Sequence, residues 1–107
     1  MRNSSSPVIA EITELAPGAC GVKGELSFGS ANGLLKDLSW RVLNGNGTTL
    51  DLAGVKWADS AGVALLLELQ RIAFQAGVQL RFMNFPDQLL AIARVAGVDK
   101  ILADFTN

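Results

Sequence analysis

The sequence contains no histidine and no tyrosine, and its single cysteine is Cys20. Without histidine, the chain cannot form a histidine-dependent catalytic triad, a histidine proton relay or most kinds of zinc site. A single cysteine excludes an intrachain disulfide and a thiolate metal cluster, and its apolar neighbours predict that Cys20 is buried. No nucleophile–base pair and no dinucleotide- or phosphate-binding glycine loop is present. We therefore expect a protein that is not an enzyme, with no catalytic residues, no metal and no cofactor.

Charge and long apolar runs are also scarce. Nine basic and ten acidic residues give a net charge of −1 without a basic block, which argues against binding to nucleic acid or to an anionic lipid surface. The richest apolar region, residues 62–69, is far shorter than the roughly 20 residues of a membrane-spanning helix, so we expect no direct membrane insertion. Residues 1–7 are polar and lack the apolar segment of a signal peptide. We expect them to form a flexible tail before a single cytoplasmic domain at residues 8–107.

Half of the residues are apolar, which is enough for one hydrophobic core in a chain of 107 residues. Alternating or β-branched stretches predict four strands, at residues 7–15, 19–26, 48–53 and 78–82. Apolar residues at helical spacing predict three helices, at residues 31–43, 61–76 and 84–96, with one or two further helical turns within 98–105. Ser30 is expected to cap the first helix, and Gly77 and Gly97 are expected to end the other two.

The order of these elements is β-β-α-β-α-β-α. The connection at residues 16–18 is so short that the first two strands are predicted to form an antiparallel hairpin. The first two helices each connect two strands, and such crossovers are almost always right-handed. We therefore predict an α/β domain with a four-stranded mixed sheet and helices mainly on one face.

The most informative stretch joins the third strand to the second helix at residues 59–62, which we call the hinge. Ser and Asp are favoured helix N-caps, so one interpretation of Ser60 is that it caps this helix, with Asp59 complementing the helix dipole. The same position would also tolerate an added phosphate. Gly62 either lets a partner backbone approach closely or lets the helix pack closely on the sheet.

The second helix carries apolar residues around most of its circumference. Its projection at helical spacing predicts an inner face formed by Val63, Leu66, Leu67, Leu69, Ala73 and Phe74. The opposite face near Ser60 presents Ala61, Ala64 and Leu65, which predicts either a protein-docking patch or a surface covered by a neighbouring loop or helix. Gln70 falls towards the inner face.

Three motifs together resemble the STAS domain, the fold of bacterial anti-sigma-factor antagonists. They are Gly24-Glu25-Leu26, the Asp59-Ser60-Ala61-Gly62 hinge and the closing segment at residues 95–102, and the resemblance covers residues 8–102. The resemblance to the antagonists implies that Ser60 is the phosphoacceptor of a partner kinase that doubles as the anti-sigma factor. Phosphate would break the complex by adding charge to the interface. Ala61 replaces a second serine that is common in the antagonists.

Residues 62–69 are more similar to the MlaB branch of the family. That branch implies a STAS subunit that binds and stabilises or regulates the ATPase subunit (MlaF-like) of an ABC phospholipid transporter that maintains outer-membrane lipid asymmetry. The chain would be cytoplasmic and peripheral to the inner membrane through its partner. Ser27 stands where the family usually has an aspartate, in a loop expected near the hinge.

The hypothesis from the sequence is that this chain is a STAS subunit of the MlaB type. The expected partner interface consists of Asp59, Ser60, Ala61, Gly62, Ala64 and Leu65. Two alternatives stay open: an anti-sigma-factor antagonist switched at Ser60, and a small-ligand-binding α/β module.

Overall fold

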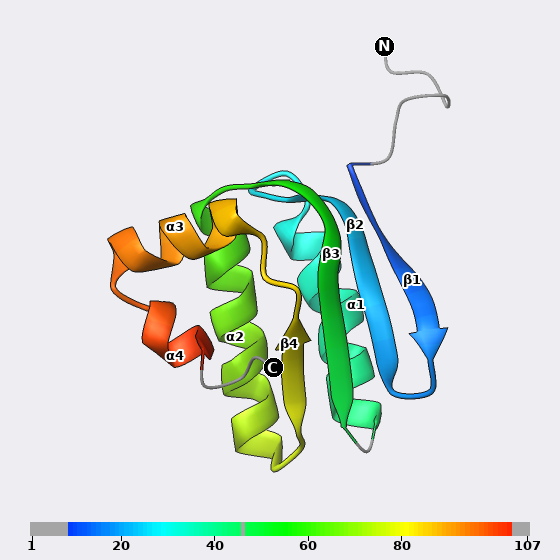
Figure 1. The fold of residues 1–107 in the computed structure, drawn as a ribbon. Helices are drawn as coiled ribbons and strands as arrows, with labels where there is room; N and C mark the ends of the chain where they lie inside the picture. Colours follow the sequence, from blue (N-terminus) through cyan, green and yellow to red (C-terminus); the bar gives the residue numbers. More distant parts are fainter. Residues whose placement is uncertain (1–8, 46, 104–107) are drawn as a thin grey trace.

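The computed structural model describes residues 9–45 and 47–103 (Figure 1). Its elements, in chain order, are β1 (Ala10–Ala16), β2 (Ala19–Leu26), α1 (Ala31–Asn44), β3 (Thr48–Ala58), α2 (Ser60–Ala76), β4 (Leu80–Met83), α3 (Asp87–Ala96) and α4 (Asp99–Ala103). This is the predicted order, with α4 as the additional helical turn. The predicted tail at 1–7 and residues 104 and 105 of the last predicted turn lie outside the described residues.

The four strands form one sheet in the order β1-β2-β3-β4. β1 and β2 are antiparallel, with Ala16 paired to Ala19 across a tight turn, whereas β2–β3 and β3–β4 are parallel. The predicted hairpin and the mixed sheet are therefore both confirmed.

The helices cover one face of this sheet. Helices α1 and α2 lie side by side behind the strands, and α3 and α4 extend the layer on the side of α2 away from α1 (Figure 1). Successive side chains of β3 point to opposite faces of the sheet. Leu50 and Leu52 are fully buried against the helices, whereas Ala53 is exposed on the other face. No helix of the described part covers the opposite face of the sheet (Figure 1).

Several predicted boundaries are wrong. β1 begins at Ala10 instead of residue 7, and α3 begins at Asp87 instead of residue 84. β3 continues from the expected end at residue 53 to Ala58, because pairing with β2 resumes after a register shift and reaches Leu26↔Ala58. β4 begins at Leu80 instead of Val78, because the amide of Val78 donates to the carbonyl of Ala73 at 3.0 Å. Val78 thus closes helix α2 together with Gly77, whose φ of 70° is the left-handed conformation expected of a helix end.

The predicted faces of helix α2 also need correction. Leu65, expected to face outward, is only 3% exposed, and Phe74, expected to face the core, is 82% exposed. The projection assumed that only one face of α2 is buried. Because α2 packs both on the sheet and beside α1, the buried part of its circumference extends to Leu65. Gln70 is buried as expected, and its Nε2 donates to the carbonyl of Ile101 in α4 at 3.3 Å.

Candidate partner-binding site at the start of helix α2

The hinge is built around the carboxylate of Asp59. Asp59 has an extended backbone between β3 and α2, and its Oδ1 accepts a hydrogen bond from the amide of Ala61 at 2.9 Å. Its Oδ2 accepts from the amide of Phe28 at 3.1 Å, across 31 residues of sequence. The amide of Asp59 donates to the carbonyl of Leu26 at 3.3 Å. Asp59 therefore joins the start of α2 to the loop between β2 and α1.

The interpretation of Ser60 as the helix cap is wrong, because Asp59 occupies the N-cap position and makes the capping bond. Ser60 is the first residue of α2 and is exposed. The amides of Ala61 and Gly62 are both bonded to Asp59, through its carboxylate and its carbonyl. A phosphate on Ser60 would thus meet a neighbouring carboxylate and amides that already have acceptors.

Gly62 is buried, and its role is close packing. A Cβ placed on Gly62 would lie 2.3 Å from the carbonyl oxygen of Leu26, a contact that no side chain permits. Of the two interpretations of Gly62, the structure supports helix–sheet packing, because the residue faces β2 and is not available to a partner.

A groove of about 460 Å³ runs between the first turns of α1 and α2. It is lined by Phe28, Ala31, Asn32, Leu35, Ala61, Ala64, Leu65 and Glu68. Ala64 is exposed, Ala61 is partly buried, and Leu65 lies at the base of the groove because it is almost wholly buried. The predicted outward patch is thus only partly present: Ala64 is accessible, whereas α1 packs beside Leu65 and supplies the second wall of the groove.

Phe28 is the residue that sequence reasoning missed. Its side chain is 85% exposed at the rim of the groove. The only signal in the sequence was an aromatic residue between Ser27 and Gly29, in a segment interpreted as a polar loop. A large exposed aromatic side chain next to an apolar groove is typical of a protein-docking surface.

Two serines hold the Phe28 loop in place. The Ser30 hydroxyl donates to the carbonyl of Glu25 at 2.8 Å and accepts from the amide of Ser27 at 3.0 Å. Ser30 stands at the N-cap position of α1, as predicted, but its side chain makes no hydrogen bond that caps the helix. Ser27 is buried and its hydroxyl donates to the carboxylate of Glu25 at 3.2 Å. The loop lies next to the hinge, as expected.

The structure therefore brings five expected interface residues to one place: Asp59, Ser60, Ala61, Ala64 and Leu65. Ser60 and Ala64 are accessible, Asp59 positions the loop, and Leu65 forms the floor of the groove. Contact with a partner stays a prediction for all of them.

Within residues 9–45 and 47–103, no three histidine, cysteine, aspartate or glutamate side chains are grouped so that they could hold a metal ion. In the same part of the chain, none of the helices has both the length and the apolar character needed to cross a membrane. Cys20 is buried, as the sequence predicted.

Comparison with known families identifies this arrangement of a four-stranded sheet and a helical layer. A family model described as the MlaB STAS domain matches residues 13–103. The chain therefore belongs to the STAS domain family, in its MlaB-type group. No curated protein sequence matches the chain.

Solved structures with the same fold include the anti-sigma-factor antagonist SpoIIAA in its unphosphorylated form. It is 13% identical, with a TM-score of 0.67 over 92% of this chain and 85% of that chain. The phosphorylated form, described as a cell-fate determinant of Bacillus, is 14% identical, with a TM-score of 0.66 over 92% and 88% of the two chains. The murine anion transporter Slc26a9 is 19% identical, with a TM-score of 0.66 over 87% of this chain but only 16% of that chain. At these identities, the likeness shows the fold alone.

Proposed function

We propose that this chain is a non-catalytic subunit that binds the ATPase subunit of an ABC phospholipid transporter, and stabilises or regulates it. The transporter would maintain the lipid asymmetry of the outer membrane. The chain would then be cytoplasmic and held at the inner membrane through its partner. The MlaB-type family match over residues 13–103 supports this choice among STAS functions.

The observation that carries the proposal is the groove between α1 and α2, with Phe28 exposed at its rim and Ser60 beside it. Interface hot spots are enriched in aromatic side chains that enter a pocket on the partner. Phe28 would be such an anchor, because its side chain is exposed while hydrogen bonds hold its backbone. Among the described residues that line the groove, Glu68 alone is ionisable, and Arg71 pairs with it.

Co-expression with the candidate ATPase subunit tests the proposal. We expect Phe28→Ala and Ser60→Glu to reduce co-purification, the first by removing the anchor and the second by adding charge and bulk at the hinge. Phe74→Ala is the matched control, since Phe74 is equally exposed but lies in the last turn of α2. If Phe28→Ala, Ser60→Ala and Ser60→Glu all left co-purification unchanged, the interface assignment would be wrong.

A second candidate function is that of an anti-sigma-factor antagonist regulated by phosphorylation of Ser60. The exposed hydroxyl on the first residue of α2 favours it, and its partner would be an anti-sigma-factor kinase. Incubation with candidate kinases and ATP, followed by mass measurement of the wild type and Ser60→Ala, separates the two functions. A phosphate adduct present only in the wild type would favour the antagonist, and its absence would favour the transporter subunit.

A further inference from the structure

The sheet has a free edge at β1. β1 is the first strand in the order β1-β2-β3-β4, and no other element of the described part of the chain lies along its outer side (Figure 1). An edge strand presents backbone N–H and C=O groups that can pair with a further strand. This edge is therefore a place where an extended segment can join the sheet.

The pairing of β1 with β2 determines which backbone groups point outward. The amide of Glu25 donates to the carbonyl of Ile9 at 2.9 Å, so Ile9 belongs to a hydrogen-bonded pair. In an antiparallel ladder such pairs alternate with pairs whose backbone groups point away from each other. The register of β1 and β2 is continuous from Ala10 to Glu14. The backbone groups of Ala10, Ile12 and Glu14 therefore point to the free edge.

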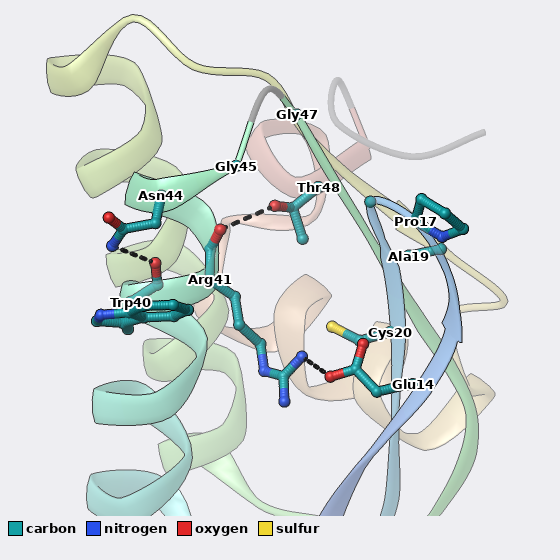
Figure 2. Close-up of a pocket in the computed structure, with 11 residues that line it drawn as sticks. Glu14, Pro17, Ala19, Cys20, Trp40, Arg41, Asn44, Gly45, Gly47 and Thr48 are labelled. Atoms are coloured by element: carbon teal, nitrogen blue, oxygen red, sulfur yellow. Dashed lines mark hydrogen bonds and ion pairs between the residues drawn. The ribbon is translucent and has the colours of Figure 1, made fainter.

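The side chains of the same three residues turn towards α1. Ala10 and Ile12 are partly buried and pack against the core, and Glu14 meets Arg41 of α1 (Figure 2). Successive side chains of a strand point to opposite faces of the sheet. An added strand would therefore also direct every second side chain towards α1.

A cleft of about 360 Å³ lies on this side, between β1 and the first half of α1, and we call it the edge cleft. Ile12 and the almost wholly buried Leu34 give it apolar surface. Gly33 also lines it and leaves space, because a Cβ on Gly33 would meet nothing within 4 Å. The edge cleft can thus receive apolar side chains of an added strand.

The charges at this edge favour a basic segment. β1 carries Glu11 and Glu14 and no basic residue, and Asp37 of α1 lines the edge cleft together with Glu11. Arg41 pairs with Glu14 and Asp37, and Lys23 stands opposite Glu11 in β2, so three carboxylates face two cations. Two copies of β1 would bring four glutamates into one ladder, where like charges are unfavourable. A segment with lysine or arginine instead balances the excess.

We propose that the free edge of β1 binds an extended basic segment of a partner protein as a fifth strand of the sheet. Its backbone pairs with that of Ala10, Ile12 and Glu14, and its apolar side chains enter the edge cleft. In strand addition, main-chain hydrogen bonds supply affinity and pockets for alternate side chains supply specificity. No residue lines both the edge cleft and the groove between α1 and α2, so this site does not depend on the proposed function.

A short capped peptide in which valine and lysine alternate tests the proposal on the full chain. Hydrogen exchange followed by NMR should show that the peptide slows exchange of the amides of Ala10, Ile12 and Glu14, because these amides gain acceptors. The amides of Glu11 and Thr13 face β2 and should change little. Such alternation distinguishes strand addition from a general gain in stability.

Two control peptides and a pair of variants separate the contributions. The peptide with glutamate in place of lysine should bind more weakly, and the peptide with all its amides methylated should not slow exchange. Cross-strand and exposed ion pairs change affinity by a factor of about two to five, so Glu11→Gln should weaken binding by that factor. Asp87→Asn is the matched control, since it removes an exposed carboxylate at the start of α3, and it should bind like the wild type.

The proposal would be overturned by unchanged exchange at Ala10, Ile12 and Glu14, or by equal binding of the glutamate peptide. Wild-type affinity in Glu11→Gln would overturn the role of charge and with it the basic partner. Slow exchange of the same three amides without peptide, rising with protein concentration and accompanied by a dimer in sedimentation, would identify a second copy as the occupant and would also overturn the proposal.

Discussion

At the scale of single residues, the hinge depends on one carboxylate with two separate tasks. Asp59 caps α2 through Oδ1 and holds the Phe28 loop through Oδ2. The sequence placed Asp59 and Ser60 together at a helix start but could not divide the roles between them, since both residue types cap helices well. It also could not place Phe28 beside the hinge, because that contact depends on how β2 and β3 pair.

Substitutions at Asp59 should separate these two tasks. We expect Asp59→Ala to lower the free energy of unfolding by about 0.5–2 kcal/mol, because the cap is lost. Asp59→Asn should keep most of this stability, since asparagine also caps, but its amide nitrogen cannot accept from the Phe28 amide when its oxygen caps α2. Chemical denaturation measures the stability, and hydrogen exchange of the Phe28 amide measures the loop. Unchanged Phe28 exchange in Asp59→Asn would contradict this division of roles.

At the scale of elements, most of the fold could be predicted because its patterns are local. The short turn before β2 and the helical spacing in α1 are local signals, and both elements were predicted within one residue of their bounds. The end of β3 and the buried arc of α2 depend on neighbours distant in sequence, and both predictions failed. Leu65 is buried because α1 packs beside α2, which no projection of α2 alone could reveal.

The close approach of α2 to β2 gives a sharp stability test. A Cβ on Gly62 would clash with the carbonyl of Leu26, so Gly62→Ala should lower the free energy of unfolding by about 1–3 kcal/mol, the usual cost of overpacking. Gly33→Ala in α1 is the matched control, because a Cβ there meets nothing within 4 Å. The control should gain about 0.5–1 kcal/mol from the better helix propensity of alanine. Equal effects of the two substitutions in urea denaturation would disprove the packing role of Gly62.

At the scale of the whole molecule, the helices cover one face of the sheet, with the groove at one end of the sheet and a cleft at the other. The groove lies at the carboxyl end of the parallel strands, where open α/β sheets commonly place their binding sites. The cleft between the last turns of α1 and the hairpin of β1 and β2 lies at the other end. On the uncovered face, Asp51 accepts hydrogen bonds from the Asn84 side chain and the Ala53 amide, both at 2.9 Å.

The Asp51 cluster should make stability depend on pH. The Asn84 hydrogen bond, followed by that of Ala53, lowers the pKa of Asp51 below its ordinary value. Because the pKa of Asp51 is lower in the folded than in the unfolded state, its ionised carboxylate stabilises the protein above about pH 4. This contribution is lost as the pH falls through the folded-state pKa. Asn84→Gly removes the side chain and still permits the backbone φ of 58°. We expect the Asp51 pKa to rise in this variant, as measured by ¹³C NMR titration of its carboxyl group.

The stability measurement provides the second half of that test. Asn84→Gly should be less stable than the wild type at neutral pH, and the difference should shrink as the pH falls below about 4. A difference that is constant between neutral and acidic pH would show that Asp51 does not contribute through its ionisation.

The central claim is that the groove between α1 and α2 binds the ATPase subunit. The most direct test compares the affinity of two arginine variants of this chain for that subunit. Ala64→Arg fills the groove, whereas Ala76→Arg places the same side chain at the exposed end of the same helix. Isothermal titration calorimetry with the purified ATPase subunit should show binding weakened at least about tenfold by Ala64→Arg, as expected at the centre of an interface, and unchanged by Ala76→Arg. Wild-type affinity in Ala64→Arg, with the fold intact, would contradict the account.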